Sequence, residues 1–461
     1  MFELQHENTH QEDFRMRQSR HAQLSILDFY AEHEHAQQLR VLSDLLDENP
    51  IILTLIKRDF TRGEVAKTGA CGLSMETILR CLLLKQILRV SYRKLAFHLS
   101  DSPSYRAFAR LRWDEMPGKS VLQNTVRQIS AETLKLINQQ LMLEWIDEGA
   151  LSVDSLRIDS TVVKSNIPNP LDSQMLNDGV RVLSRMMSKT HAATGIKFRF
   201  TDQRKKSKSL SFQIFHAKKP VKDALYPKLL ACVSTTLKQL DRAITRIRLE
   251  TNLPEKAQSW IEKADHYRSL LLQVVDQTQR RVFNNEKVPA SEKLFSLFEP
   301  HTDIIVKTNR DVEYGHKVNL ATQAEGFVTY LNIEDGNPSD KSLFLPVLDA
   351  CEKEYGDVPM ETVADGGYAS TENVEQGREK GVNRTVFNKR CGLGYHQMGV
   401  KKKTFDKLKN FRAGVEGNIS ELKRALSMDK ARWKGSDGFN AYVWSSALSY
   451  NLVRMVRFSS A

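Results

Sequence analysis

The chain has no long apolar run. None of its 461 residues belongs to a stretch that approaches the roughly 18 consecutive apolar residues of a membrane-spanning helix. The first residues, MFELQHENTHQEDF, are charged and contain no apolar core like that of a secretory signal. We therefore expect a soluble cytoplasmic protein with no membrane partner.

Cysteine is scarce and scattered. The sequence contains five cysteines, an odd number, and no two of them form a CxxC pair. A disulfide framework or a cysteine-ligated zinc site needs paired or clustered cysteines. The sequence therefore predicts neither kind of site at Cys71, Cys81, Cys232, Cys351 and Cys391.

Acidic residues are outnumbered by basic ones, 56 against 68, which gives a formal net charge of +12 and a sequence pI of about 9.3. Such an excess of positive charge favours a polyanionic partner. On charge alone, nucleic acid is the first candidate and an anionic membrane surface is the second, and nucleic acid is the partner that we expect.

The first third of the chain is predicted to be helical. Ser74, Ser91 and Ser120 stand where the N-terminal capping residues of three helices would stand. The third helix would bury Leu122, Val126 and Ile129 and expose Lys119, Gln123, Asn124 and Arg127. Amide and guanidinium groups on an exposed helix face suit base edges and phosphates, as in helix-turn-helix proteins. An ordinary solvated helix face is the other interpretation.

Residues 151–163, LSVDSLRIDSTVV, have the β-branched residues and rough alternation of a strand. Asp154 and Asp159 are an odd number of positions apart, so an unbroken strand would send them to opposite faces. Only one of them can serve a given site. We choose Asp159, which is followed by Ser160 and Thr161.

Residues 172–300 are again helical and strongly charged. Apolar residues recur at alternating spacings of four and three over 233–247 and 257–274, which predicts an antiparallel helical hairpin. A core seam explains these residues without a cofactor. A basic stretch precedes the hairpin, and it is either a solvated loop or a phosphate-binding segment. Its cations are Lys197, Arg199, Arg204, Lys205, Lys206 and Lys208.

Strand signals return from Tyr314. Two strands, 315–322 and 327–333, are joined by a short turn of hairpin type. We then expect a helix over 341–355 capped by Asp340, a buried strand over 361–364, a helix over 371–381, a strand over 384–388, a basic loop with Lys401, Lys402 and Lys403, and a final helix. A hairpin followed by β-α-β units implies a mixed sheet flanked by helices.

That final helix contains RAGVEGNISELK, residues 412–423. At about 100° per residue, Arg412, Glu416 and Lys423 fall within roughly 40° of one another, so one carboxylate lies between two cations. Such a carboxylate can ligate a metal while its neighbours hold phosphates. The alternative is an exposed helix with salt bridges at favourable spacing.

Three carboxylates then form a candidate constellation. Asp365 follows a buried strand and precedes two glycines, which allow a sharp turn and the approach of a ligand, although Asp-Gly-Gly is also an ordinary turn. Residues past the carboxyl ends of strands converge on one crevice. Together with Asp159 and Glu416, Asp365 would supply oxygen ligands for two Mg²⁺ ions, or Mn²⁺. Such ions would serve an in-line phosphoryl displacement.

The local sequences resemble a known family. Asp159-Ser160-Thr161 after a strand, Asp365-Gly366-Gly367-Tyr368 after another, and Arg412-x3-Glu416-x6-Lys423 on a late helix resemble the signature blocks of bacterial insertion-sequence DDE transposases. The segment GLSMETILRCLLLKQILRVSYRKLAFHL is similar to the domain that precedes catalysis in many of them. The resemblance covers roughly residues 70–450.

The resemblance implies a ribonuclease H-like α/β catalytic domain over 150–461, a helical DNA-binding domain over 1–148 and a helical insertion over 172–300. It implies Mg²⁺-dependent cutting and joining of double-stranded DNA at the ends of an element, by a dimer or larger complex at the bacterial nucleoid. Asp159, Asp365 and Glu416 would be catalytic metal ligands, and Arg412 and Lys423 would contact the DNA backbone.

The chain departs from the family pattern at two points. Lys409 stands where the pattern has tyrosine, and the insertion follows the first strand, whereas better-known relatives carry theirs before the glutamate helix. A structure-specific nuclease of the same fold is one alternative function. A non-catalytic DNA-binding protein derived from a transposase is another, and the presence of all three carboxylates disfavours it.

Overall fold

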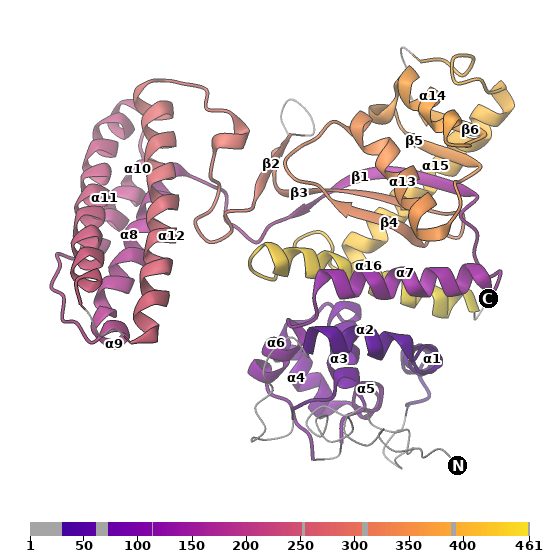
Figure 1. The fold of residues 1–461 in the computed structure, drawn as a ribbon, viewed down its shortest axis with the longest axis horizontal. Coiled ribbons are helices and arrows are strands. Elements are labelled where there is room, and N and C mark those ends of the chain that lie inside the picture. Colours follow the sequence, from indigo (N-terminus) through magenta and orange to yellow (C-terminus); the bar gives the residue numbers. More distant parts are fainter. Residues whose placement is uncertain are drawn as a thin grey trace, which may run out of the picture. The chain divides into compact units, whose positions relative to one another are not determined.

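The computed structural model describes residues 30–60, 72–112, 114–250, 254–306, 312–388 and 393–459. Their contacts divide the chain into two compact units (Figure 1). The first unit comprises the described parts of residues 1–164 and 317–461, and the second comprises those of residues 165–316. The predicted domains, 1–148, 150–461 and the insertion 172–300 within the second, stay a prediction.

A mixed sheet forms the centre of the first unit, where its strands lie in the order β4-β3-β1-β5-β6. The parallel pairs are β1 with β5 and β5 with β6, and β3 with β4 is antiparallel. In the second unit, β2 pairs antiparallel with the first residues of β3. The strands are β1 (Ser155–Lys164), β2 (Asp303–Val306), β3 (Val312–Thr322), β4 (Val328–Ile333), β5 (Glu361–Asp365) and β6 (Arg384–Asn388).

The predicted hairpin is confirmed as β3 and β4. Its turn contains Gly326 at φ +85°, a conformation that side chains with a Cβ rarely adopt. β1 begins at Ser155, later than the predicted 151, and the exposed Asp154 precedes it. β2 was not predicted.

Seven helices precede the sheet in the described part of the chain. Ser74 and Ser91 accept the backbone N–H groups of Thr77 and Lys94, which confirms both predicted caps. The predicted cap at Ser120 is wrong, because its helix begins at Lys119 after Gly118. The helices are α1 (Glu34–Glu48), α2 (Ile51–Phe60), α3 (Met75–Ile87), α4 (Tyr92–Asp101), α5 (Pro103–Ala109), α6 (Lys119–Val126) and α7 (Ala131–Asp147).

The helices that follow β4 cover the sheet and join it to the N-terminal helices. α13 (Phe344–Tyr355) and α14 (Thr371–Glu379) pack on each other, and α15 (Lys402–Ala425) packs on β1, β5 and β6. α16 (Ser436–Ser459) packs along α7, as Figure 1 shows. Two apolar clusters result, one including α3, α7 and α16 and the other including α13 and α14. The predicted mixed sheet flanked by helices is confirmed.

The predicted helix start after Asp340 is wrong. A 3-10 turn occupies Asp340–Leu343, and α13 begins at Phe344. The Asp340 carboxylate accepts a hydrogen bond from Ser160 Oγ at 3.1 Å and pairs with Lys317 Nζ, also at 3.1 Å. The Asp340 carboxylate is thus engaged by Ser160 of β1 and Lys317 of β3, and it does not cap the helix.

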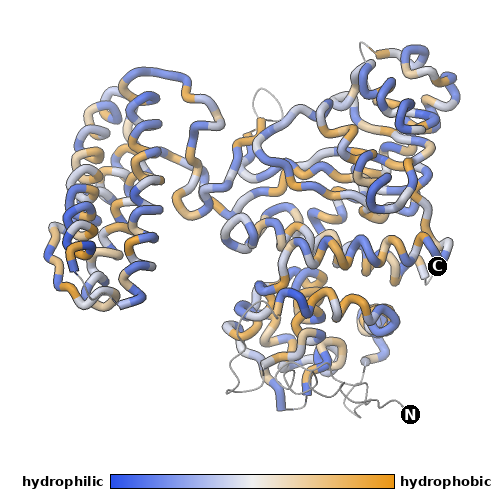
Figure 2. Tube along the Cα trace, viewed as in Figure 1, coloured by the Kyte–Doolittle hydropathy of each residue, from blue (hydrophilic) through white to orange (hydrophobic). Residues whose placement is uncertain are grey.

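The second unit is a helical bundle with its own apolar core. It contains α8 (Asp172–Ser188), α9 (Thr190–Thr194), α10 (Arg204–His216), α11 (Lys219–Arg248) and α12 (Glu255–Thr278). Hydrophobic and hydrophilic residues alternate along these helices (Figure 2). The residues of the two predicted seams are buried or half-buried, but they pack on α8 and α10 as well as on each other. The predicted two-helix hairpin is therefore part of a larger bundle.

Candidate active site

Two of the three predicted carboxylates lie side by side because of strand register. β1 and β5 run parallel, and Ile158 is the partner of Ala364. The next residues along the two strands are Asp159 and Asp365, at the carboxyl end of β5. Neighbouring strands lie about 4.8 Å apart, so this register holds the two aspartates close together.

Helix α15 brings the third carboxylate. It packs against β1, β5 and β6 through a face that buries Val415 and Leu422. Glu416 follows Val415 and is exposed, with Arg412 one turn earlier on the same side. Glu416 therefore lies beside the buried face of α15, where its carboxylate is open to solvent.

All three carboxylates contact one guanidinium. Arg412 Nη2 lies 3.2 Å from Asp159 Oδ2 and 3.3 Å from Asp365 Oδ1, and Arg412 Nη1 lies 2.9 Å from Glu416 Oε1. Both aspartate oxygens contact the same nitrogen, Arg412 Nη2, so the distance between Asp159 Oδ2 and Asp365 Oδ1 cannot exceed the sum of these two contact distances. The structure thus brings together three side chains that are far apart in sequence.

The three carboxylates differ in exposure. The side chain of Asp159 is 16% exposed and that of Arg412 is 11% exposed, whereas Asp365 and Glu416 are 48% and 63% exposed. Asp159 thus forms the floor of the cluster. The other two carboxylates form a rim that a ligand can reach from solvent.

The pKa of Asp159 is raised to about 6, chiefly by burial and to a smaller extent by the negative charges of Asp365 and Glu416. Arg412 and the Ser160 N–H, which donates to Asp159 Oδ1 at 2.8 Å, act in the opposite direction. One guanidinium therefore does not fully offset the burial and the three negative charges. The cluster has an excess of negative charge that a further cation would relieve.

A second layer of polar contacts lies beside the cluster. Ser160 bonds to Asp340, and Lys317 donates to the Pro338 carbonyl at 2.7 Å as well as pairing with Asp340. A Cβ at Gly367 would lie 2.7 Å from Asp340 Oδ2, so this glycine of Asp-Gly-Gly allows the close approach of a carboxylate. Sequence reasoning assigned Asp340 only to a helix cap and missed its place here.

Arg157 is another residue that sequence reasoning missed. It lies two positions before Asp159 on β1, and it is buried with its guanidinium 4.7 Å from the centre of the Phe411 ring. Its Nη2 donates to the carbonyls of Gln323 and Ala324 at 2.6 and 3.3 Å. It therefore joins β1 to the β3–β4 turn and to α15. An arginine in the middle of a buried strand was the available signal.

The predicted DNA-binding residues lie in several places. Arg412 contacts the carboxylates, and Lys423 lies half-buried further along α15. On α6, Lys119 and Asn124 are exposed and Gln123 is half-buried, while Arg127, just after it, is exposed and donates to the Lys434 carbonyl at 3.0 Å. In the second unit, Arg204 pairs with Asp202 at 2.6 Å, and Lys205 and Lys206 are exposed on α10. DNA contacts by these residues stay predictions.

Within the described part of the chain, no group of three His, Cys, Asp or Glu side chains is arranged as it stands to hold a metal ion. At the carboxylate cluster, the guanidinium of Arg412 lies among the oxygens. The donor set itself consists of carboxylate oxygens, which are the ligands that Mg²⁺ and Mn²⁺ prefer. The residues present therefore fit a hard divalent cation that would exchange for the guanidinium.

Two family models match the chain. One, described as "Transposase DDE domain", matches residues 274–452, and the other, described as "Transposase domain (DUF772)", matches residues 27–128. The chain belongs to the insertion-sequence DDE transposases. Neither the curated proteins nor the solved structures yield a match to it.

The match to the transposase DDE domain includes two of the three carboxylates, Asp365 and Glu416. Asp159 lies before its first residue, and most of the helical bundle separates the two. Transposases act on DNA. In the described part of this transposase, every helix is too short or too polar to cross a membrane.

Proposed function

We propose that this transposase cleaves DNA strands at the ends of an insertion element and transfers those ends to target DNA, in a reaction that depends on divalent metal ions. The observation that carries the proposal is the convergence of Asp159, Asp365 and Glu416 on the single guanidinium of Arg412. Three carboxylates around one site are suited to a hard cation and its phosphate ligand. A purely structural ion-pair network does not need a rim of two exposed acids.

We further propose that the sheet is ribonuclease H-like and that the bundle is an insertion after its first strand. The strand order β4-β3-β1-β5-β6 supports this, with an antiparallel hairpin on one side of β1 and two parallel strands on the other. Both candidate aspartates then belong to the two adjacent central strands. The helical N-terminal region would be the part that binds element ends.

The metal ligands would be Asp159, Asp365 and Glu416. When bound, two divalent cations activate the attacking oxygen and stabilise the leaving oxygen of a phosphodiester. Asp159 is oriented for this role because the Ser160 N–H holds Oδ1 while Oδ2 faces the cluster. Its burial excludes water from the floor of the site, and the exposed Asp365 and Glu416 face incoming DNA.

Arg412 has two sets of possible acceptors. In this structure it donates to carboxylates, and a phosphate is a comparably good acceptor for a guanidinium. We propose that it turns to the DNA backbone when cations occupy the carboxylates, with Lys423 as a second contact further along α15. The cations and amides on and just after α6, Lys119, Gln123, Asn124 and Arg127, would bind the element ends, as would Arg204, Lys205 and Lys206 of α10.

We propose that one copy of the transposase acts at each of the two element ends, in a dimer or larger complex on DNA. It would act at the nucleoid in the cytoplasm.

The variant Glu416→Gln tests the proposal. It removes one carboxylate charge at an exposed position and leaves the basic surface unchanged, so strand cleavage should fall to background while binding of element ends changes less than about twofold. The matched control is Glu421→Gln on the same helix. Glu421 pairs with Arg457 and Arg454 away from the cluster, and its loss should leave cleavage near the wild-type rate.

Cleavage and binding gel assays would separate the alternatives. Wild-type nicking by Glu416→Gln would remove this residue from the site. Cleavage without joining of pre-cut ends would indicate a nuclease. Gel shifts that need no Mg²⁺, with no cleavage by the wild-type chain, would indicate a protein that only binds DNA.

A further inference from the structure

The second unit carries an exposed aromatic cluster on α10. The side chains of Phe212 and Phe215 are 66% and 59% exposed, which is unusual for phenylalanine in a bundle with a well-packed core. Both rings contact His216, with ring centres 4.5 Å away for Phe212 and 4.8 Å away for Phe215. The cluster of Phe212, Phe215 and His216 presents ring surface to solvent.

Cations occupy the same face of α10. At about 100° per residue, Lys205 and Lys208 fall on the same side of the helix as Phe212 and Phe215. Both lysines are exposed, and no ion pair links them to an acidic side chain among the described residues. The sequence between Gln203 and Lys222 contains no aspartate or glutamate. This face therefore combines aromatic rings with two lysines that form no ion pair among the described residues.

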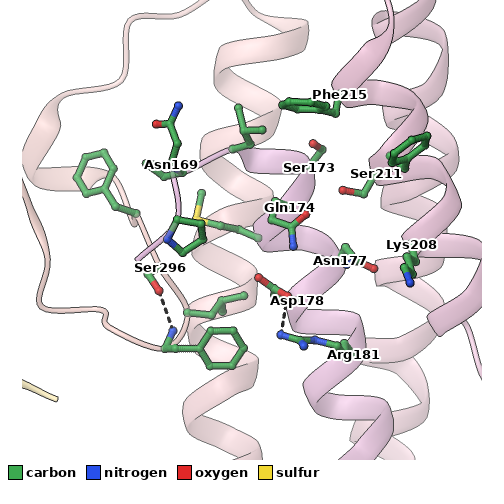
Figure 3. A pocket seen from close by; sticks show the side chains of 18 of the residues that line it. Asn169, Ser173, Gln174, Asn177, Asp178, Arg181, Lys208, Ser211, Phe215 and Ser296 are labelled. Atoms are coloured by element: carbon green, nitrogen blue, oxygen red, sulfur yellow. Dashed lines mark hydrogen bonds and ion pairs between the residues drawn. The ribbon is translucent and has the colours of Figure 1, made fainter. Parts of the chain in front are cut away.

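A pocket of about 780 Å³ adjoins the cluster. Phe212, Phe215 and His216 line one side of it, and α8 and the segments around Asn169 and Ser296 line the rest. Figure 3 shows the amide and hydroxyl groups of Asn169, Gln174, Asn177 and Ser211 around this space together with Lys208. Amides can both donate and accept hydrogen bonds, as the edge of a nucleobase requires.

We propose that this pocket and the adjacent face of α10 bind unpaired nucleotides of DNA. Bases would stack on Phe212 and Phe215, phosphates would contact Lys205 and Lys208, and the amides would contact a base edge inside the pocket. Aromatic rings next to cations are how proteins bind single strands with little sequence preference. The positive charge favours this occupant over a second copy of the chain, whose net charge is also positive. The proposal rests on the proposed action on DNA.

The test uses the full chain without divalent metal, so that cleavage does not interfere. The probe is a single-stranded oligodeoxynucleotide with 2-aminopurine at its centre, compared with the same strand paired to its complement. The variant is Phe212→Ala with Phe215→Ala. Because both rings are exposed, the double variant should keep its melting temperature. The matched control is Phe283→Ala, a 44% exposed phenylalanine of the same unit outside the pocket lining.

The double variant should lose roughly 5- to 150-fold in affinity for the single strand for each ring that stacks on a base. The fluorescence change of 2-aminopurine on binding should disappear, while affinity for the duplex stays within about twofold. Phe283→Ala should bind both probes like the wild type. Lys205→Gln with Lys208→Gln should reduce the slope of log affinity against log salt by about 0.7 for each phosphate that these lysines neutralise in the wild type.

Three results would overturn the inference. The first is an unchanged affinity of the double variant for the single strand, and the second is an equal loss of its affinity for the duplex. The third is that the double variant no longer sediments as a dimer but still binds the single strand, which would make this face an interface between copies. Glu416→Gln separates this inference from the proposed function, because it should bind the single strand like the wild type. If the wild-type chain cuts DNA and the double variant still binds the single strand with wild-type affinity, the inference about this pocket is wrong and the proposed function stands.

Discussion

Two glycines on α15 should respond in opposite ways to alanine. A Cβ at Gly414 would overlap Arg157 Nη1 and lie 2.7 Å from its Cζ, whereas a Cβ at Gly417 would have no heavy atom within 4 Å. Both positions lie in the same helix, so both gain about 1 kcal/mol of helix propensity from alanine. The difference between the two variants therefore measures the contact with Arg157.

The cost at position 414 follows from the bonds of Arg157. The side chain cannot move aside freely, because it is buried under Phe411 and donates to Thr322 Oγ1 and to the carbonyls of Gln323 and Ala324. Loss of one or two hydrogen bonds from a charged donor costs about 1.5–3 kcal/mol each. After the gain in propensity, Gly414→Ala should be less stable than the wild type by roughly 2 kcal/mol. Gly417→Ala should be more stable by roughly 0.5–1 kcal/mol.

Calorimetry of the full chain would measure both variants. We expect the transition of the first unit to fall by roughly 4 °C for Gly414→Ala and to rise by a degree or two for Gly417→Ala. In the background of Arg157→Met, Gly414→Ala should cost much less, because the clash is with the guanidinium. Equal effects of the two alanines would refute the assignment of Arg157 as the residue that sets the position of α15 against β1.

Two further predictions concern buried or half-buried cations. Burial lowers the pKa of Lys85 to about 8, although the rings of Tyr92, Trp433 and Tyr442 lie 5.3–5.6 Å from its ammonium. The unfolded chain binds this proton up to about pH 10.5, so stability should rise with pH from about 8 to 10.5. Lys85→Met should then be more stable than the wild type at pH 7 by up to about 3 kcal/mol, an advantage that shrinks toward pH 10 in thermal unfolding. A constant difference across this range would contradict the assignment. Arg412→Gln should be less stable by roughly 3 kcal/mol without metal and should gain more from added Mg²⁺ than the wild type does, because three carboxylates then lack their shared cation. An equal or smaller Mg²⁺-dependent rise in melting temperature would argue against cation binding there.

The elements with strong local signals could be predicted from the sequence. The β3–β4 hairpin, the short strands β5 and β6, and the capped starts of α3 and α4 all lie where alternation, turn residues or serine caps placed them. Elements defined by tertiary partners were missed. β2 has only four residues and gains its structure by pairing with β3.

α16 was missed for a different physical reason. Its central residues are buried all round, between α7, α3 and α1, so they show no amphipathic period. The bundle was recognised only through the seams of α11 and α12, because α8 and α10 contribute to the same core from a distance in sequence.

The candidate site was predicted as a set of carboxylates but not as a network. Asp159, Asp365 and Glu416 were selected for their places after strands and on a helix, and they do lie together, although Asp159 lies within β1 and not after it. The sequence could not show that Arg412 joins all three, since this depends on the register of β1 against β5 and on the packing of α15 over both strands. The contact of Asp340 with Ser160 likewise joins two segments that are far apart in sequence, the 3-10 turn after β4 and β1.

We propose above that Asp159, Asp365 and Glu416 hold divalent cations. Anomalous diffraction from crystals of the full chain grown with Mn²⁺ tests it most directly. We predict an anomalous peak bounded by Asp159, Asp365 and Glu416, with the Arg412 guanidinium moved away from them, and loss of that peak in Asp365→Asn. Mn²⁺ bound only elsewhere, with Arg412 still bonded to all three carboxylates, would contradict the account.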